Sequence, residues 1–198
     1  MRILLLADSH GIRMDMKMMD RINGCVVKSV QVSQRTSLIR RKYVSKLNEI
    51  NRFRPDIILL HTGHNDIMRH PVHNQHPTHL KYYFEELQRF CSLLMANHPY
   101  ALFLLSSAFP RTVGPAMDSV KKRQYNRLAV RLGAMVRAYA IRRNFGYILN
   151  SVLWVSVRQL EEQANLFRSD GLHLTSAGQD AVADGWVAAA RYFWTTLG

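Results

Sequence analysis

Residues 55–66 read Pro-Asp-Ile-Ile-Leu-Leu-His-Thr-Gly-His-Asn-Asp and decide the fold class of this chain. Four consecutive large aliphatic residues, 57–60, follow a proline and precede a cluster of polar residues. A short apolar run of this kind is typical of a strand that is buried on both faces of a parallel sheet. The polar residues 63–66 would then follow the carboxyl end of the strand, which is where ligands bind in such sheets.

The same pattern recurs along the chain and predicts an α/β fold. Apolar runs predict further strands over residues 2–7, 26–33, 101–106 and 146–150. Apolar residues at helical spacing predict helices over 37–52, 79–97 and 117–143, and a last helix that starts at Ser176 with a capping box to Gln179 and runs towards Trp194. Alternating strands and helices predict a three-layer α/β/α sandwich around a flavodoxin-like parallel five-stranded sheet. No linker or repeat divides the chain, so residues 1–198 are expected to form one domain.

Composition excludes several classes of protein. With 47% apolar and 21% charged residues, the chain can bury a core and is not of the disordered class. The first apolar run is interrupted by Asp8 and is too short for a secretory signal, and no stretch approaches the roughly 20 apolar residues of a membrane span. Cys25 and Cys91 are expected to be reduced thiols. We therefore expect an intracellular, cytoplasmic protein.

Three polar clusters are predicted to meet at one edge of the sheet. Ser9 follows the first strand, residues 63–66 follow the third, and Asp170 and His173 precede the last helix. A serine hydroxyl is a weak nucleophile that needs a base and a group to orient the base, and Ser9, His173 and Asp170 are of the right types for these roles. The side-chain amide of Asn65 and the backbone N–H of Ser9 can stabilise a developing oxyanion.

These blocks resemble those of the SGNH (GDSL-like) hydrolases. Residues 7–10, Ala-Asp-Ser-His, resemble the opening Gly-Asp-Ser block, residues 63–66 the Gly-X-Asn-Asp block, and residues 170–173 the closing Asp-X-X-His block. Residues 108–111 after the fourth strand and residues 125–126 in the long helix also fit. The blocks occur in the family's order and span nearly the whole chain.

The resemblance implies a serine esterase that hydrolyses a small acyl ester through an acyl-enzyme. It implies Ser9, His173 and Asp170 as the catalytic triad, without a metal or organic cofactor. It also places Gly63, His64 and Asn65 at the oxyanion or substrate-binding side of the site.

One block departs from the family pattern. The family usually has a glycine after the second strand, whose backbone N–H is a further oxyanion donor, and residues 32–36 contain none. A backbone N–H of Ser33 or Gln34 would have to serve, and loss of such a donor costs about 10²–10³ in rate. The alternative function is therefore a nucleic-acid- or membrane-associated module with a weak or vestigial esterase site.

Two metal-binding alternatives are less well supported by the sequence. Asp8 and His10 fit the Asp-X-His opening of metallophosphoesterases, but the further ligand blocks that those enzymes need are missing. Six of the nine histidines lie between residues 61 and 79, and histidine clusters can bind zinc. Pro71 and Pro77 favour a solvated loop there, so no metal is expected.

The net charge is the unusual feature of the composition. Lys and Arg exceed Asp and Glu by 27 − 14 = 13. Two predicted helices carry much of the excess, at Arg40, Arg41, Lys42 and Lys46, and at Lys121, Lys122, Arg123 and Arg127. Such a surface can bind nucleic acid or an anionic membrane, and a solvated helix face is the alternative. A basic domain of this family also resembles the esterase domain in first-open-reading-frame proteins of some non-LTR retrotransposons.

Overall fold

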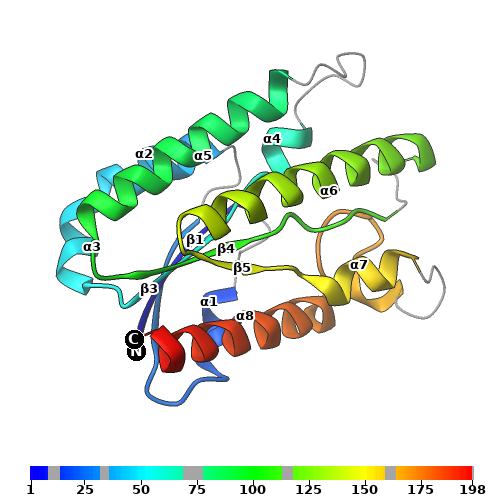
Figure 1. Cartoon of the computed structure of the whole chain (residues 1–198). Helices are drawn as coiled ribbons and strands as arrows, with labels where there is room; N and C mark the ends of the chain where they lie inside the picture. Colours follow the sequence, from blue (N-terminus) through cyan, green and yellow to red (C-terminus); the bar gives the residue numbers. More distant parts are fainter. Residues whose placement is uncertain (9–13, 32–35, 69–77, 113–117, 159–163, 198) are drawn as a thin grey trace.

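The computed structural model of the chain describes residues 1–8, 14–31, 36–68, 78–112, 118–158 and 164–197 (Figure 1). Its strands are β1 (Arg2–Ala7), β2 (Val26–Gln31), β3 (Ile57–His61), β4 (Leu102–Ser106) and β5 (Gly146–Ile148). Its helices are α1 (Met14–Met19), α2 (Thr36–Ser45), α3 (Leu47–Phe53), α4 (His64–Met68), α5 (Thr78–Asn97), α6 (Ser119–Arg142), α7 (Ser151–Arg158), the 3-10 helix η2 (Ala164–Leu166) and α8 (Ser176–Leu197).

The five strands form one parallel sheet in the order β2-β1-β3-β4-β5. β1 pairs on both sides, so that Ile3 lies opposite Val27 of β2 and Ile57 of β3. Every residue of β3 is buried, as expected for a strand covered on both faces. The three-layer, flavodoxin-like α/β/α sandwich predicted from the sequence is confirmed.

Helices cover both faces of the sheet (Figure 1). Helices α2, α3, α5 and α6 cover one face, where Tyr43 and Phe90 are fully buried. Helices α1, α7 and α8 cover the other, where Trp186 is fully buried. Leu4 of β1 packs into the first core and Leu5 into the second, because successive side chains of a strand point to opposite faces.

Helix α8 is tied to α1 by ion pairs as well as by apolar contacts. Lys17 Nζ lies 2.9 Å from an Asp180 carboxylate oxygen, and Arg21 Nη2 lies 2.6 Å from the same oxygen. Arg21 also pairs with Asp184 through Nε. Residues near positions 20 and 180 therefore lie side by side on this face of the sheet.

Two details of the predicted helices are wrong. The helix expected over residues 37–52 is divided into α2 and α3 at Lys46. Ser45 Oγ donates to the backbone oxygen of Lys42 at 2.8 Å, and such side-chain bonds to the backbone compete with helical hydrogen bonding. The capping box of Ser176 and Gln179 is also wrong, because Thr175 Oγ1 accepts the backbone N–H of Gly178 at 3.2 Å and is the N-cap group.

The two cysteines and the apolar character of the helices were also considered in the sequence. Cys25 and Cys91 are both free thiols, and Cys91 is buried in the core. In the described ranges, no helix combines the length and the apolar character that a membrane span requires.

Candidate active site

Polar residues lie at the carboxyl edge of the sheet. Asp8 follows β1, His64 follows β3, Ser107 follows β4 and Asn150 follows β5, and all four are buried. Because the strands are parallel, these residues from distant parts of the sequence are brought to the same edge.

Asp170 and His173 form a hydrogen-bonded pair. His173 Nδ1 lies 2.7 Å from Asp170 Oδ2, and the two side chains are 46% and 40% exposed. The other carboxylate oxygen, Oδ1, accepts the backbone N–H groups of Leu172 at 2.7 Å and His173 at 2.9 Å. Partial burial acts to raise the pKa of Asp170, but the hydrogen bonds from the His173 ring and the two N–H groups outweigh it and lower this pKa to about 2. Asp170 is therefore an ionised acceptor that orients the imidazole of His173.

The loop that carries this pair is held by the segment after β4. Thr112 N–H donates to the Gly171 oxygen at 3.1 Å, and Arg111 Nη1 donates to the Leu172 oxygen at 2.7 Å. Arg111 is 2% exposed, and its guanidinium carbon lies 4.9 Å from the ring centre of Tyr125. The sequence analysis identified residues 108–111 only as a minor feature of the family resemblance. It did not predict that Arg111 binds the loop beside His173.

Gly63 and Asn65 are placed by the turn from β3 into α4. Gly63 has φ of +111°, and an added Cβ would lie 3.1 Å from Leu132 Cδ2 and from Tyr83 Oη, so only glycine fits without strain. Asn65 is partly buried in the first turn of α4. The neighbouring Asp66 accepts the backbone N–H and the hydroxyl of Thr36, at 3.1 and 2.9 Å. These bonds connect α4 to the start of α2.

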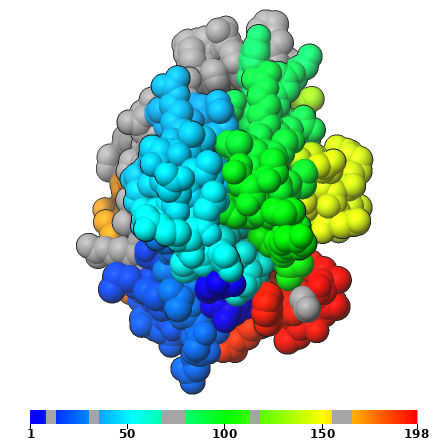
Figure 2. All heavy atoms as spheres, turned by 90° about the vertical axis from the view of Figure 1, so that its left-hand side faces the viewer, coloured from blue at the N-terminus to red at the C-terminus, as the bar shows by residue number. Residues whose placement is uncertain are grey.

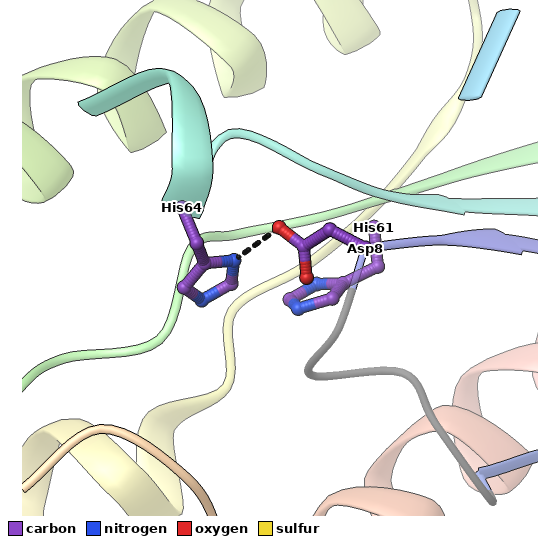
Figure 3. Close-up of side chains that lie close together, drawn as sticks. All are labelled: Asp8, His61 and His64. Carbon is purple, nitrogen blue, oxygen red and sulfur yellow. Dashed lines mark hydrogen bonds and ion pairs between the residues drawn. The ribbon is translucent and has the colours of Figure 1, made fainter. Parts of the chain in front are cut away.

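His64 links two of the strand ends (Figure 3). Its Nδ1 lies 3.0 Å from Asp8 Oδ2, and its Nε2 accepts the backbone N–H of Phe109 at 2.7 Å. A nitrogen that accepts an N–H carries no proton, so the Nδ1 nitrogen carries the proton and donates it to Asp8. Burial lowers the pKa of His64 well below its usual range, which keeps this tautomer neutral. The hydrogen bonds from His64 thus join the end of β1 to the segment after β4.

His61 lies beside this link, under the carboxyl edge. Its ring is fully buried, 4.2 Å from the ring centre of Phe109 and 5.1 Å from that of Trp186. His61 Nδ1 lies 3.1 Å from Ser106 Oγ, which also accepts from Asn150 Nδ2 at 2.9 Å. Burial lowers the pKa of His61 to about 3. His61 is therefore neutral in the folded protein.

Asp8, His61 and His64 are the described residues that could together ligate a metal, with candidate ligand atoms within 4.8 Å of one another (Figure 3). The bonds to Asp8 and to Phe109 N–H already occupy both ring nitrogens of His64. A metal ion would have to displace one of these bonds. These hydrogen bonds account for both ring nitrogens of His64 without an ion, whereas Nε2 of His61 is buried and has no hydrogen-bond partner among the described residues.

The predicted site residues fall into two groups. Asp170 and His173 are in contact, and Gly63, His64 and Asn65 lie at the end of β3 on the carboxyl edge. The segment 109–112 contacts both groups, through Phe109 to His64 and through Arg111 and Thr112 to the 170–173 loop. Ser9, Ser33 and Gln34 lie outside the described residues, as do His70, His73 and His76 of the six histidines between 61 and 79.

The predicted basic surface is divided. Helices α2 and α6 cover the same face of the sheet, but α5 lies between them (Figures 1 and 2). Arg40 of α2 pairs with Glu86 of α5, at 2.5 Å from Nε to Oε1. The basic residues of α2 and those of α6 therefore do not form one continuous patch.

The parallel sheet in the order β2-β1-β3-β4-β5, with helices on both faces, matches the α/β fold of the SGNH hydrolases. The sequence matches the model of the GDSL-like lipase/acylhydrolase family over residues 17–181, and the chain belongs to this family. It is accordingly a carboxylic ester hydrolase by class. The matched range includes Asp170 and His173. A search of curated proteins gives no match.

Solved structures with the same fold include several esterases. A GDSL-like lipase from Bacteroides thetaiotaomicron VPI-5482 superposes with a TM-score of 0.68 and 17% identity, over 96% of this chain and 88% of the other. The acetyl xylan esterase AlAXEase gives 0.72 and 17%, over 96% and 99%. The acetylxylan esterase Axe2 from Geobacillus stearothermophilus gives 0.68 and 16%, over 95% and 93%. At these identities the likeness establishes the fold.

Proposed function

We propose that the chain, as a single domain, hydrolyses a small acyl ester, with Ser9 as nucleophile, His173 as general base and Asp170 as the group that orients His173. The observation that supports this most directly is the 2.7 Å bond between His173 Nδ1 and Asp170 Oδ2. It fixes the Nδ1 proton on the side of the carboxylate, so the other ring nitrogen, Nε2, is the one that can accept a proton from a serine. A histidine held in this tautomer is prepared to act as a base.

The proposed reaction has two stages. Ser9 Oγ attacks the carbonyl carbon and gives its proton to His173 Nε2, which then protonates the departing alcohol as the acyl-enzyme forms. A water molecule, deprotonated by His173, attacks the acyl-enzyme and releases the acid. Asp170 stays ionised throughout and stabilises the imidazolium, consistent with its lowered pKa.

The oxyanion is proposed to accept hydrogen bonds from the Asn65 side chain and from backbone N–H groups of Ser9 and of Ser33 or Gln34. The turn at Gly63 supports this role for Asn65, because it brings the first turn of α4 to the carboxyl edge beside Asp8. The absence of glycine from residues 32–36 favours slow turnover, since a side chain there narrows the approach to the donor.

An acetyl-like group is the proposed acyl part of the substrate. Two of the structural neighbours are named as acetylxylan esterases, and both share the fold over nearly their whole length. The alternative, a basic nucleic-acid- or membrane-associated module with a weak or vestigial esterase site, predicts little or no turnover of small esters.

Ser9→Ala tests the proposal. It should abolish hydrolysis of p-nitrophenyl acetate, and a fluorophosphonate probe should label Ser9 in the wild-type protein and nothing in the variant. Ser45→Ala, an exposed serine at the end of α2, is the matched control and should leave both readouts unchanged. Full activity in Ser9→Ala would overturn the triad, and activity that is lost on dialysis against EDTA and restored by zinc would replace it with a metal mechanism.

A further inference from the structure

Helix α6 carries positive charge that the esterase chemistry does not use. Over residues 119–142 the helix has seven Lys or Arg residues and no Asp or Glu. Five of the seven are exposed arginines: Arg123, Arg127, Arg131, Arg137 and Arg142. Hydrolysis of a small neutral ester requires no such array.

The exposed arginines of α6 lie on one side of the helix. Arg123, Arg127 and Arg131 follow at four-residue intervals, which places them about 6 Å apart along the axis and on one stripe. The opposite side is buried in the core through Tyr125 and Leu132. The helix of 24 residues is roughly 36 Å long, and the stripe from Arg123 to Arg142 extends over roughly 29 Å of it.

The charge on this stripe is not compensated within the described part of the chain. Lys121 of α6 forms an ion pair with the N-cap residue Asp118, with 3.3 Å between Nζ and Oδ2. The five arginines form no ion pair with the acidic residues that the structure describes. On α2, by contrast, Arg40 pairs with Glu86 of α5. Helix α5 separates the two groups (Figure 2).

The form of the stripe favours a linear polyanion over a bilayer. Exposed small residues, Ala134 and Ala138, lie among the arginines and leave room for a polymer backbone to approach. Val120, Leu128, Val130 and Ile141 are the exposed large apolar residues of α6, and none is aromatic. A helix that lies in a membrane surface instead directs an apolar face rich in Trp, Phe or Leu into the lipid, whereas the aromatic residues of α6, Tyr125 and Tyr139, are buried in the core. Arginine is also the side chain best suited to phosphate.

We propose that the arginine stripe of α6, residues 123–142, binds the phosphate backbone of nucleic acid. Binding is independent of the ester hydrolysis proposed above, because the stripe lies on the outer side of α6 and uses none of the proposed catalytic residues. Each phosphate neutralised releases condensed counterions, so the affinity should fall steeply with salt.

The test compares two variants that lose the same charge. One changes Arg123, Arg127, Arg131 and Arg137 to Gln on α6. The control changes Arg41 of α2, Arg52 of α3 and the two residues that flank α3, Lys46 and Arg54, to Gln. Binding of a fluorescein-labelled single-stranded oligonucleotide is followed by anisotropy over a range of salt. The slope of log K against log salt should become shallower by about 3 in the α6 variant, since each contact contributes about 0.7, and by less than about 1 in the control.

Three outcomes would overturn the proposal. Equal changes in both variants would show that net charge, and not the stripe, attracts the oligonucleotide. Absence of oligonucleotide binding to the wild-type protein at about 0.15 M salt would leave the stripe a solvated face. Binding to phosphatidylserine vesicles without binding to the oligonucleotide would assign the stripe to a membrane. Circular dichroism melting curves of both variants establish that they are folded.

Discussion

Hydrogen bonds and burial together fix the charge states of Asp170 and His64, two of the residues that we assign to the site. Asp170 accepts three hydrogen bonds and stays ionised, while His64 donates through one ring nitrogen, accepts through the other and stays neutral. The two Asp–His pairs therefore differ. In one, the ionised Asp170 accepts a hydrogen bond from His173, and in the other, the neutral His64 donates to Asp8. The surrounding backbone N–H groups and the degree of burial make the difference.

Asp170→Asn should lower kcat for p-nitrophenyl acetate by about 10⁴-fold with little change in KM. The amide is close to the carboxylate in shape, but it offers one oxygen where the carboxylate offers two and cannot stabilise an imidazolium. Asp180→Asn is the matched control, because that carboxylate pairs with Lys17 and Arg21 on the α1 side of α8. Near-wild-type kcat in Asp170→Asn would remove Asp170 from the role of the group that orients His173.

At the scale of single residues, the sequence predicts contacts between residues that are close along the chain and misses contacts between residues that are far apart in it. The pairing of Asp170 and His173 follows from a separation of three residues in a loop. The bonds from His64 to Asp8, from Phe109 to His64 and from Arg111 to Leu172 join residues 56, 45 and 61 positions apart. Such bonds depend on the relative placement of strand ends and side-chain tautomers, which no local pattern encodes.

For helices and strands, the success of the prediction depends on the length of the element. The buried strands and the long helices α5, α6 and α8 were predicted within a few residues, because an apolar run or a 3.6-residue period is unmistakable over that length. The short helices α1, α4 and α7 were not predicted, since five to eight residues span too few turns to show a period. The break at Lys46 was missed because it arises from a local side-chain bond.

Helix α8 offers a test in which one substitution is made at two positions. A Cβ at Gly178 would lie 2.2 Å from the backbone oxygen of Leu166, whereas a Cβ at Gly185 meets nothing within 4 Å. Gly185→Ala should stabilise the protein by about 0.5–1 kcal/mol, through helix propensity alone. Gly178→Ala should destabilise it by about 1–3 kcal/mol, because the backbone has to move to relieve the overlap. Urea unfolding of both variants measures the difference, and shifts of the same sign would contradict the packing described for α8 against η2.

For the molecule as a whole, the buried neutral histidines determine how stability depends on pH. His61 and His64 have lowered pKa values in the folded state, while in the unfolded chain each has a pKa of about 6.5. Below pH of about 6.5 the unfolded chain binds protons that the folded protein cannot accept. Stability is therefore complete above this pH and is lost as the pH falls.

The free energy of unfolding should be about 4 kcal/mol lower at pH 5 than at pH 7.5, with about half of this from each histidine. Urea titrations at the two pH values measure the loss. His61→Gln removes one of the titrating groups, so the variant should lose only about half as much between the same pH values. An equal free energy of unfolding for the wild-type protein at both pH values would mean that neither histidine is held neutral.

The position of α8 in the fold has a consequence for how the protein is made. Val182, Trp186 and Ala190 complete the apolar core on one face of β1, although they follow that strand by about 180 residues. On a ribosome that adds about 5–20 residues per second, this face of the sheet lacks α8, the longest of its helices, for on the order of ten seconds or more. The nascent chain therefore exposes Ile3, Leu5 and Leu59 to other chains during that time, and chaperones that hold apolar segments should raise the yield of folded protein.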